Sequence, residues 1–158
     1  MKIKLICIGN IKQEYAQIGC QFFESRIKAF GHPFEVVELK DTIRTDGANA
    51  QKWKADEAIR IKKALEDVCY WIAMDERGSD YTSVQFSQLI DRCQNQSLKQ
   101  IAFVIGGPDG LDAELKGSAD LKLRLGAMTL PHELARLVLT EQIYRGLSIL
   151  KNLPYHRV

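Results

Sequence analysis

The chain has few of the residues that build disulfide frameworks or metal sites. Its 158 residues include four cysteines, at positions 7, 20, 69 and 93, and three histidines. No two cysteines form a C-x-x-C pair, and Cys7 and Cys69 lie in or beside apolar segments, where a free thiol behaves as a small hydrophobe. We therefore expect no metal site, and we expect a protein of the cytoplasm rather than a secreted disulfide scaffold.

Long apolar runs and a strong excess of one charge are also absent. No segment approaches the length of a membrane span, so no membrane partner is expected. The apolar part of residues 1–9 is too short for a signal peptide and lacks a small-residue cleavage site. The formal net charge is +2, with 46% hydrophobic and 27% charged residues. These values predict one globular domain over residues 1–158, and the charge alone does not indicate a nucleic-acid binder.

Short apolar runs alternate with helical patterns along the whole chain. This alternation predicts an α/β fold, in which a parallel sheet is covered by helices on both faces. The predicted strands are 3–8, 34–39, 70–74, 101–105 and 121–123, and the predicted helices are 14–30, 50–68, 84–94, 112–116 and 131–150.

Two glycine-containing or apolar loops follow the later strands. The run 101–105 stops at Gly106 and Gly107, and glycine lets the main chain approach a ligand closely. The loop 125–130 is poor in charge and leads into Pro131, a favourable first helical residue. Ligands of parallel sheets bind beyond the carboxyl ends of the strands, so both loops are candidates for a pocket that reads a flat heterocycle.

The glycine signal has a plainer interpretation as a tight turn formed with Pro108 and Asp109. Its spacing, Gly106-Gly107-x-x-Gly110, matches neither the dinucleotide fingerprint nor the P-loop. A nucleotide-using oxidoreductase is therefore disfavoured.

The chain contains four informative segments, which are 105–111, 128–132, 136–145 and 155–157. In combination they resemble the bacterial RlmH family. These enzymes methylate N3 of a pseudouridine in large-subunit (23S) ribosomal RNA. The resemblance implies a SPOUT-type fold with a deep trefoil knot near the carboxyl terminus, S-adenosyl-L-methionine as cofactor, a homodimer, and the assembled ribosome as substrate. Parallel topology alone would predict an unknotted sheet, because knots are rare.

The resemblance also implies site residues. The cofactor would be bound at the ends of the third and fourth strands and by the loop before the last helix. The implied contacts are Met74, Gly106, Leu125, Gly126, Ala127, Met128, Thr129 and Leu130.

The predicted catalytic residues are Tyr155, His156 and Arg145. Tyr155 offers a stacking face for a flipped base, His156 has the pKa range of a general base, and Arg145 could hold a phosphate or a carbonyl oxygen. The plainer interpretations are a frayed tail and an ordinary helical ion pair, because Glu141 lies four residues before Arg145.

Two further patterns leave alternatives open. Basic residues in the loop 40–47 and the following helix could contact RNA phosphates, or could form a solvated face with ion pairs. The last helix is apolar on several sides, which indicates burial against a second subunit or a central place in one core. From a different functional class, the chain could be a non-catalytic ribosome- or RNA-binding factor with a vestigial pocket.

Overall fold

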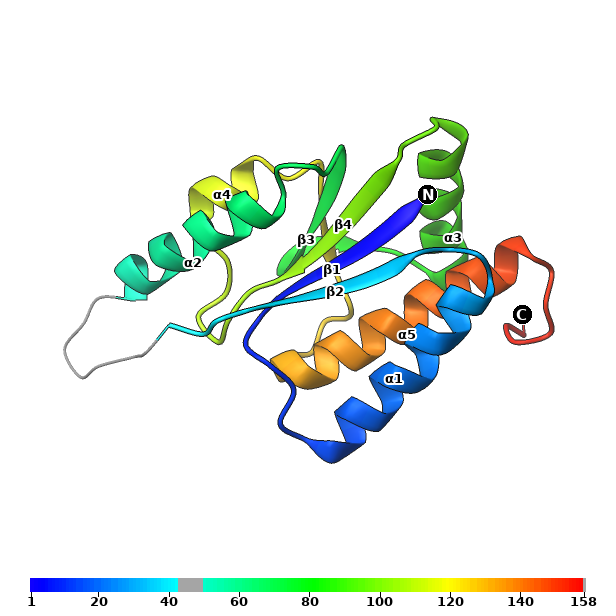
Figure 1. Cartoon of the computed structure of the whole chain (residues 1–158), viewed down its shortest axis with the longest axis horizontal. Helices are drawn as coiled ribbons and strands as arrows, with labels where there is room; N and C mark the ends of the chain where they lie inside the picture. Colours follow the sequence, from blue (N-terminus) through cyan, green and yellow to red (C-terminus); the bar gives the residue numbers. More distant parts are fainter. Residues whose placement is uncertain (43–49, 158) are drawn as a thin grey trace.

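The computed structural model describes residues 1–42 and 50–157, which form a parallel sheet flanked by helices (Figure 1). The five strands lie in the order β2-β1-β4-β3-β5, and every neighbouring pair is parallel. The predicted α/β class is confirmed, and the trefoil knot stays a prediction. The elements are β1 (Lys2–Ile8), α1 (Glu14–Ala29), β2 (Phe34–Leu39), α2 (Ala50–Ala64), β3 (Tyr70–Asp80), α3 (Ser83–Asn95), β4 (Gln100–Ile105), α4 (Ala113–Gly117), β5 (Leu121–Arg124) and α5 (His132–Leu150).

Helices cover both faces of the sheet. Successive strand residues point to opposite faces, so Ile3 and Leu5 of β1 pack on the side of α1, α3 and α5. Ile6 and Ile8 pack on the other side, against α2 and α4. Both faces are therefore apolar, which explains why strands such as β4 are buried along their whole length. None of the helices in the described ranges is long and apolar enough to cross a membrane.

Helix α2 ends earlier than the predicted boundary at Val68. The Nζ of Lys4, a buried residue on β1, donates to the main-chain oxygen of Ala64 at 3.2 Å and to Asp67 Oδ1 at 2.7 Å. The helix has therefore ended before Asp67, whose carboxylate pairs with Lys4 on β1. The predicted basic loop 40–47 lies, from residue 43 onward, outside the described residues.

Strand β3 is irregular after Met74. Both Met74 and Ser79 pair with Leu123 of β5, so the residues between them bulge out of the ladder. At Gly78 the two strands approach so closely that an added Cβ would lie 2.6 Å from the main-chain nitrogen and carbonyl carbon of Leu123. Only glycine fits at this crossing.

Gly78→Ala should destabilise the fold by about 1–3 kcal/mol, because the new methyl group meets main chain that cannot rotate away. Urea unfolding measures the change. The matched control is Gly117→Ala, where an added Cβ meets no atom within 4 Å. Equal midpoints for Gly78→Ala and wild type would contradict the close crossing.

Candidate active site

Three adjacent strands bring the predicted cofactor residues to one edge of the sheet. β3 lies between β4 and β5, and Met74 pairs with Leu123 near the end of β5. Gly106 directly follows β4, and Leu125 directly follows β5. Since parallel strands end on the same side, Met74, Gly106 and the loop 125–130 all belong to the carboxyl edge.

The loop 125–130 is open and its main chain is unused. Met128 is 83% exposed, and an added Cβ at Gly126 would meet no atom within 4 Å. Outside helices and strands, no main-chain hydrogen bond among the described residues involves residues 125 to 130. Their N–H and C=O groups are therefore available to a ligand, which fits the predicted backbone recognition of a heterocycle.

Gly106 is buried and closely approached by its own loop. A Cβ there would lie 3.0 Å from the carbonyl carbon of Gly110 and from Leu111. The glycine is thus required for the tight path of residues 106–111, and any side chain would displace this loop from the carboxyl edge.

An ion pair ties the middle of β3, directly after Met74, to α4. Lys116 Nζ donates to Asp75 Oδ2, and the main-chain N–H of Arg77 donates to Asp75 Oδ1 at 2.8 Å. Burial raises the pKa of Asp75, but these two bonds outweigh it and the pKa lies below the usual value. Asp75 is therefore a fixed carboxylate that holds this part of β3, next to Met74, beside the site.

A second carboxylate orders the loop after β1 against the start of α5. Glu133 Oε2 accepts the main-chain N–H groups of Lys12 at 3.0 Å and Gln13 at 2.8 Å. The side chain of Gln13, the N-cap residue of α1, makes no cap bond. Glu133 therefore caps α1 from another helix, and the Gln13 bond is the main cause of the lowered pKa of Glu133.

The predicted catalytic residues form one cluster at the far end of α5. Glu141 Oε1 accepts bonds from Tyr155 Oη at 2.9 Å and from Arg145 Nε at 2.9 Å. The Arg145 guanidinium lies over the Tyr155 ring, 4.7 Å from its centroid, and its Nη1 lies 3.4 Å from His156 Nδ1. The tail is therefore packed rather than frayed, and the predicted Glu141–Arg145 ion pair is confirmed.

This tail cluster, made of Glu141, Arg145, Tyr155 and His156, lies far from the carboxyl edge of its own chain. Arg145 is more than three helical turns beyond His132, a rise of about 20 Å. Figure 1 shows the start of α5 beneath the strand ends and the carboxyl terminus at the opposite end of the molecule. Sequence reasoning placed both groups in one site, and a single chain does not bring them together.

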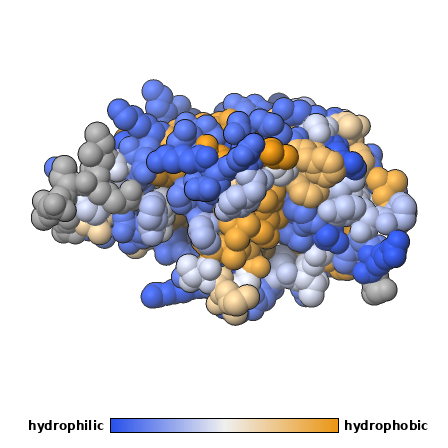
Figure 2. Space-filling view, turned by 90° about the horizontal axis from the view of Figure 1, so that it is seen from below, coloured by the Kyte–Doolittle hydropathy of each residue, from blue (hydrophilic) through white to orange (hydrophobic). Residues whose placement is uncertain are grey.

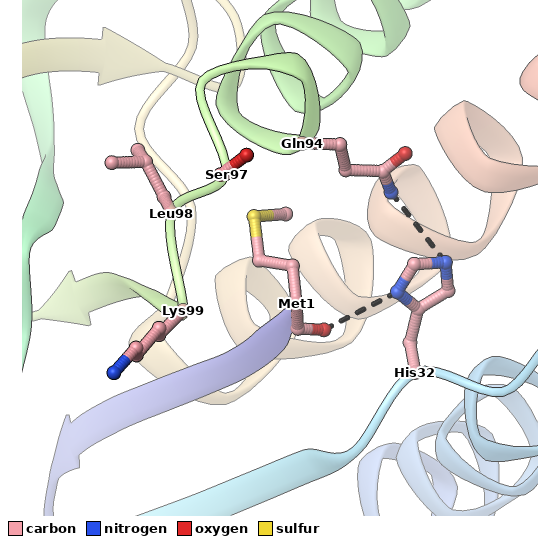
Figure 3. Close-up of a pocket in the computed structure, with 6 residues that line it drawn as sticks. All are labelled: Met1, His32, Gln94, Ser97, Leu98 and Lys99. Carbon is pink, nitrogen blue, oxygen red and sulfur yellow. Dashed lines mark hydrogen bonds between the residues drawn. The ribbon is translucent and has the colours of Figure 1, made fainter.

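A hollow of about 520 Å³ lies at the other, amino-terminal edge of the sheet (Figure 3). His32 Nδ1 contacts the main-chain oxygen of Met1 at 3.3 Å, and Gln94 Nε2 lies 3.5 Å from His32 Nε2. Lys99 points away from these groups. Since the polar groups are engaged with one another, and parallel sheets bind ligands at the opposite edge, this hollow is not the candidate site.

The described residues contain no group of three or more His, Cys, Asp or Glu side chains arranged to hold a metal ion. The candidate site thus has two parts. One is the carboxyl edge of the sheet, where main-chain groups are available to a ligand, and the other is the remote tail cluster.

Comparison with known proteins identifies relatives along the entire chain. Residues 1–156 match the family described as predicted SPOUT methyltransferases. A relative from Streptococcus pyogenes serotype M18, the ribosomal RNA large subunit methyltransferase H, is 41% identical, and the match covers 99% of this chain and 100% of the relative. The Streptococcus uberis protein of the same name is 40% identical over the same shares.

Solved structures support the fold. A probable methylase family protein from Haemophilus influenzae matches with a TM-score of 0.57 at 14% identity, covering 99% of this chain and 70% of that one. A probable methyltransferase from Bordetella pertussis matches with a TM-score of 0.57 at 15% identity, covering 92% and 95%. At these identities the likeness shows a shared fold.

Glu133→Ala should lower stability by about 1 kcal/mol at neutral pH, because the main-chain N–H groups of Lys12 and Gln13 lose their acceptor. The pKa of Glu133 is lowered in the folded state, so its contribution is present above the ordinary glutamate pKa and is lost as the pH falls through the lowered value. Urea unfolding at several pH values should show the gap to wild type closing below about pH 4. A gap that is unchanged at low pH would exclude the carboxylate as the cause; Glu114→Ala, on the exposed side of α4, is the control.

Proposed function

The chain belongs to the SPOUT methyltransferase family, and we propose that it methylates N3 of a pseudouridine in large-subunit ribosomal RNA. It is a ribosomal RNA methyltransferase that uses S-adenosylmethionine. The observation that carries the assignment is the full-length 41% identity to a ribosomal RNA large subunit methyltransferase H. The nucleotide, the assembled ribosome as substrate and the cytoplasm as the place of action are our proposals.

The carboxyl edge fits the cofactor. We propose that Met74 and Gly106 flank it and that the residues of the loop 125–130 bind it through their free main-chain groups. When bound, S-adenosylmethionine supplies an electrophilic methyl group on a sulfonium. The protein must align the nucleophile with that methyl group, and such positioning can supply most of the rate gain.

Gly106→Val should reduce S-adenosylmethionine affinity at least tenfold, because the side chain displaces the loop 106–111. Isothermal calorimetry on folded protein measures it. Met128→Leu is the matched control and should bind almost as wild type, since its volume is nearly kept and the residue is exposed. Wild-type affinity in Gly106→Val would remove this edge as the cofactor site.

A homodimer would bring the two remote parts of the site together. Helix α1 exposes Tyr15, Ile18 and Phe22, and Ile18 is 60% exposed. Beside them, half-buried Leu137 of α5 packs against Gly19. Figure 2, which looks onto the underside where α1 lies, shows an apolar patch in the middle of this face. An exposed apolar patch on so small a protein is typical of a protein interface.

The pairing we propose is antiparallel. Two identical patches meet across a two-fold axis, and a two-fold axis perpendicular to α5 places the end of one α5 beside the start of the other. The tail cluster of one protomer then lies at the carboxyl edge of its partner. For the last helix the sequence left open burial against a second subunit or a central place in one core, and its buried residues Leu139 and Ile143 pack within their own protomer. The contact surface is therefore α1 together with the half-buried side of α5.

We propose a role for each side chain of the tail cluster. Burial, and then the Glu141 carboxylate, raise the pKa of Tyr155, so Tyr155 stays protonated and offers its ring to a flipped base. Arginine only donates, so His156 Nδ1 accepts in its contact with Arg145 and Nε2 carries the proton. His156 and Arg145 are then donors for the carbonyl oxygens, which gain charge when the imide N–H gives its proton to water. In this arrangement His156 acts as a donor and not as the general base expected from the sequence.

Deleting residues 155–158 should leave the fold, the dimer and S-adenosylmethionine affinity nearly unchanged. Methyl transfer should fall more than a hundredfold, equivalent to about 2.7 kcal/mol of transition-state stabilisation. Labelled transfer to ribosomes lacking the modification measures this, and light scattering checks the dimer. Near wild-type turnover by the truncated protein would leave Arg145 as the leading catalytic candidate.

The same assay tests the function itself. Wild-type protein should methylate unmodified ribosomes, and nucleoside analysis should find the label on N3 of a pseudouridine. A protein that binds ribosomes but neither binds S-adenosylmethionine nor transfers a methyl group would instead be a non-catalytic RNA-binding factor.

A further inference from the structure

One carboxylate connects every member of the tail cluster. Glu141 Oε1 accepts from Arg145 Nε at 2.9 Å, from Arg145 Nη2 at 2.5 Å and from Tyr155 Oη at 2.9 Å. Arg145 in turn contacts His156. The side chain of Glu141 is only 17% exposed. Bonds between ionised groups are stronger than neutral ones, and a shared acceptor fixes its donors relative to one another.

The other oxygen of Glu141 is held from the opposite side. Gln142 Nε2 donates to Glu141 Oε2 at 2.7 Å, and Ser83 Oγ donates to Gln142 Oε1 at 2.8 Å. Ser83 is the first residue of α3, directly after a capping box at Thr82 that fixes the helix start. The carboxylate is therefore oriented by the body of the protein.

We infer that Glu141 is the positioning residue of the catalytic tail. It does not touch the RNA; it holds the Tyr155 ring and the Arg145 guanidinium in the arrangement in which they meet the base. This inference rests on the proposed methyl transfer. The tail has few other anchors, since Tyr155 packs edge-on against Tyr144 at 4.7 Å and residues 151–154 are exposed. Without Glu141 the tail would keep the packing of Tyr155 against Tyr144. It would lose the hydrogen bond that fixes Tyr155 relative to Arg145.

The inference requires Glu141 to affect turnover by positioning Tyr155 and Arg145, and not by stabilising the folded protein as a whole. Glu141→Gln keeps the size of the side chain and one carbonyl acceptor, but removes the charge. The expected result is a turnover at least tenfold below wild type, with KM for ribosomes and affinity for S-adenosylmethionine within about twofold. Glu114→Gln is the matched control, because its ion pair with Lys62 is exposed and remote from the tail.

Two further measurements separate positioning from general stability. In a double-mutant cycle with Tyr155→Phe, the double variant should be little worse than the poorer single variant, because both changes break one unit. In a phenol titration, with Tyr155→Phe as the blank, Tyr155 should ionise at lower pH in Glu141→Gln, since the carboxylate contributes to its raised pKa. Wild-type turnover in Glu141→Gln, or fully multiplicative losses in the cycle, would overturn the inference.

Proton NMR makes the test independent of catalysis. Cross-peaks between the Tyr155 ring and the Arg145 side chain, which lie 4.7 Å apart in the stacked arrangement, should weaken in Glu141→Gln whether or not any methyl group is transferred. If wild type methylates nothing while these cross-peaks weaken in the variant, the proposed function fails and the anchoring role stands. Equal cross-peaks in the two proteins would show that Glu141 does not position the tail.

Discussion

The length of α5 separates the proposed cofactor edge from the tail cluster, and the proposed roles of both depend on that separation. The helix has 19 residues, and at 1.5 Å per residue it spans about 28 Å. It is held rigidly, because Leu139 and Ile143 are fully buried and Gly146 lets Ile90 of α3 approach closely. The described residues that follow α5 lie at the far end of the helix. In the dimer that we propose, a second copy supplies the missing part of the site.

Within the tail cluster, Glu141 and Arg145 form a charge-balanced pair that is packed against Tyr155. Such a cluster adds little non-specific affinity for a polyanion, which is consistent with a net charge of only +2. We propose that recognition depends on how the flipped base fits between Tyr155 and the donors of Arg145 and His156. Such a fit would let a chain of small net charge select one nucleotide.

Local patterns were enough to predict the α/β class and to place Met74, Gly106 and the loop 125–130 at one edge of the sheet. They were not enough to predict where β3 and β5 approach closely or how Glu141 contacts Tyr155. The run 101–105 and its glycine pair predicted a buried strand with a loop at its carboxyl end, because both signals lie in a few consecutive residues. The close approach of Gly78 to Leu123 depends on a register shift between strands, and no local pattern encodes it. Likewise Glu141 and Arg145 read as an ordinary helical pair, since the Tyr155 contact joins residues fourteen positions apart.

Complementation between two inactive variants tests most directly whether the site is shared between protomers. Gly106→Val lacks the cofactor edge but keeps the tail, whereas the 155–158 deletion lacks the tail but keeps the edge. When the two proteins are mixed and allowed to exchange subunits, heterodimers should contain one intact composite site and regain methyl transfer to ribosomes. Recovery well above the summed activities of the separate variants is predicted. No recovery, with heterodimers demonstrated in the mixture, would contradict a site built from two chains.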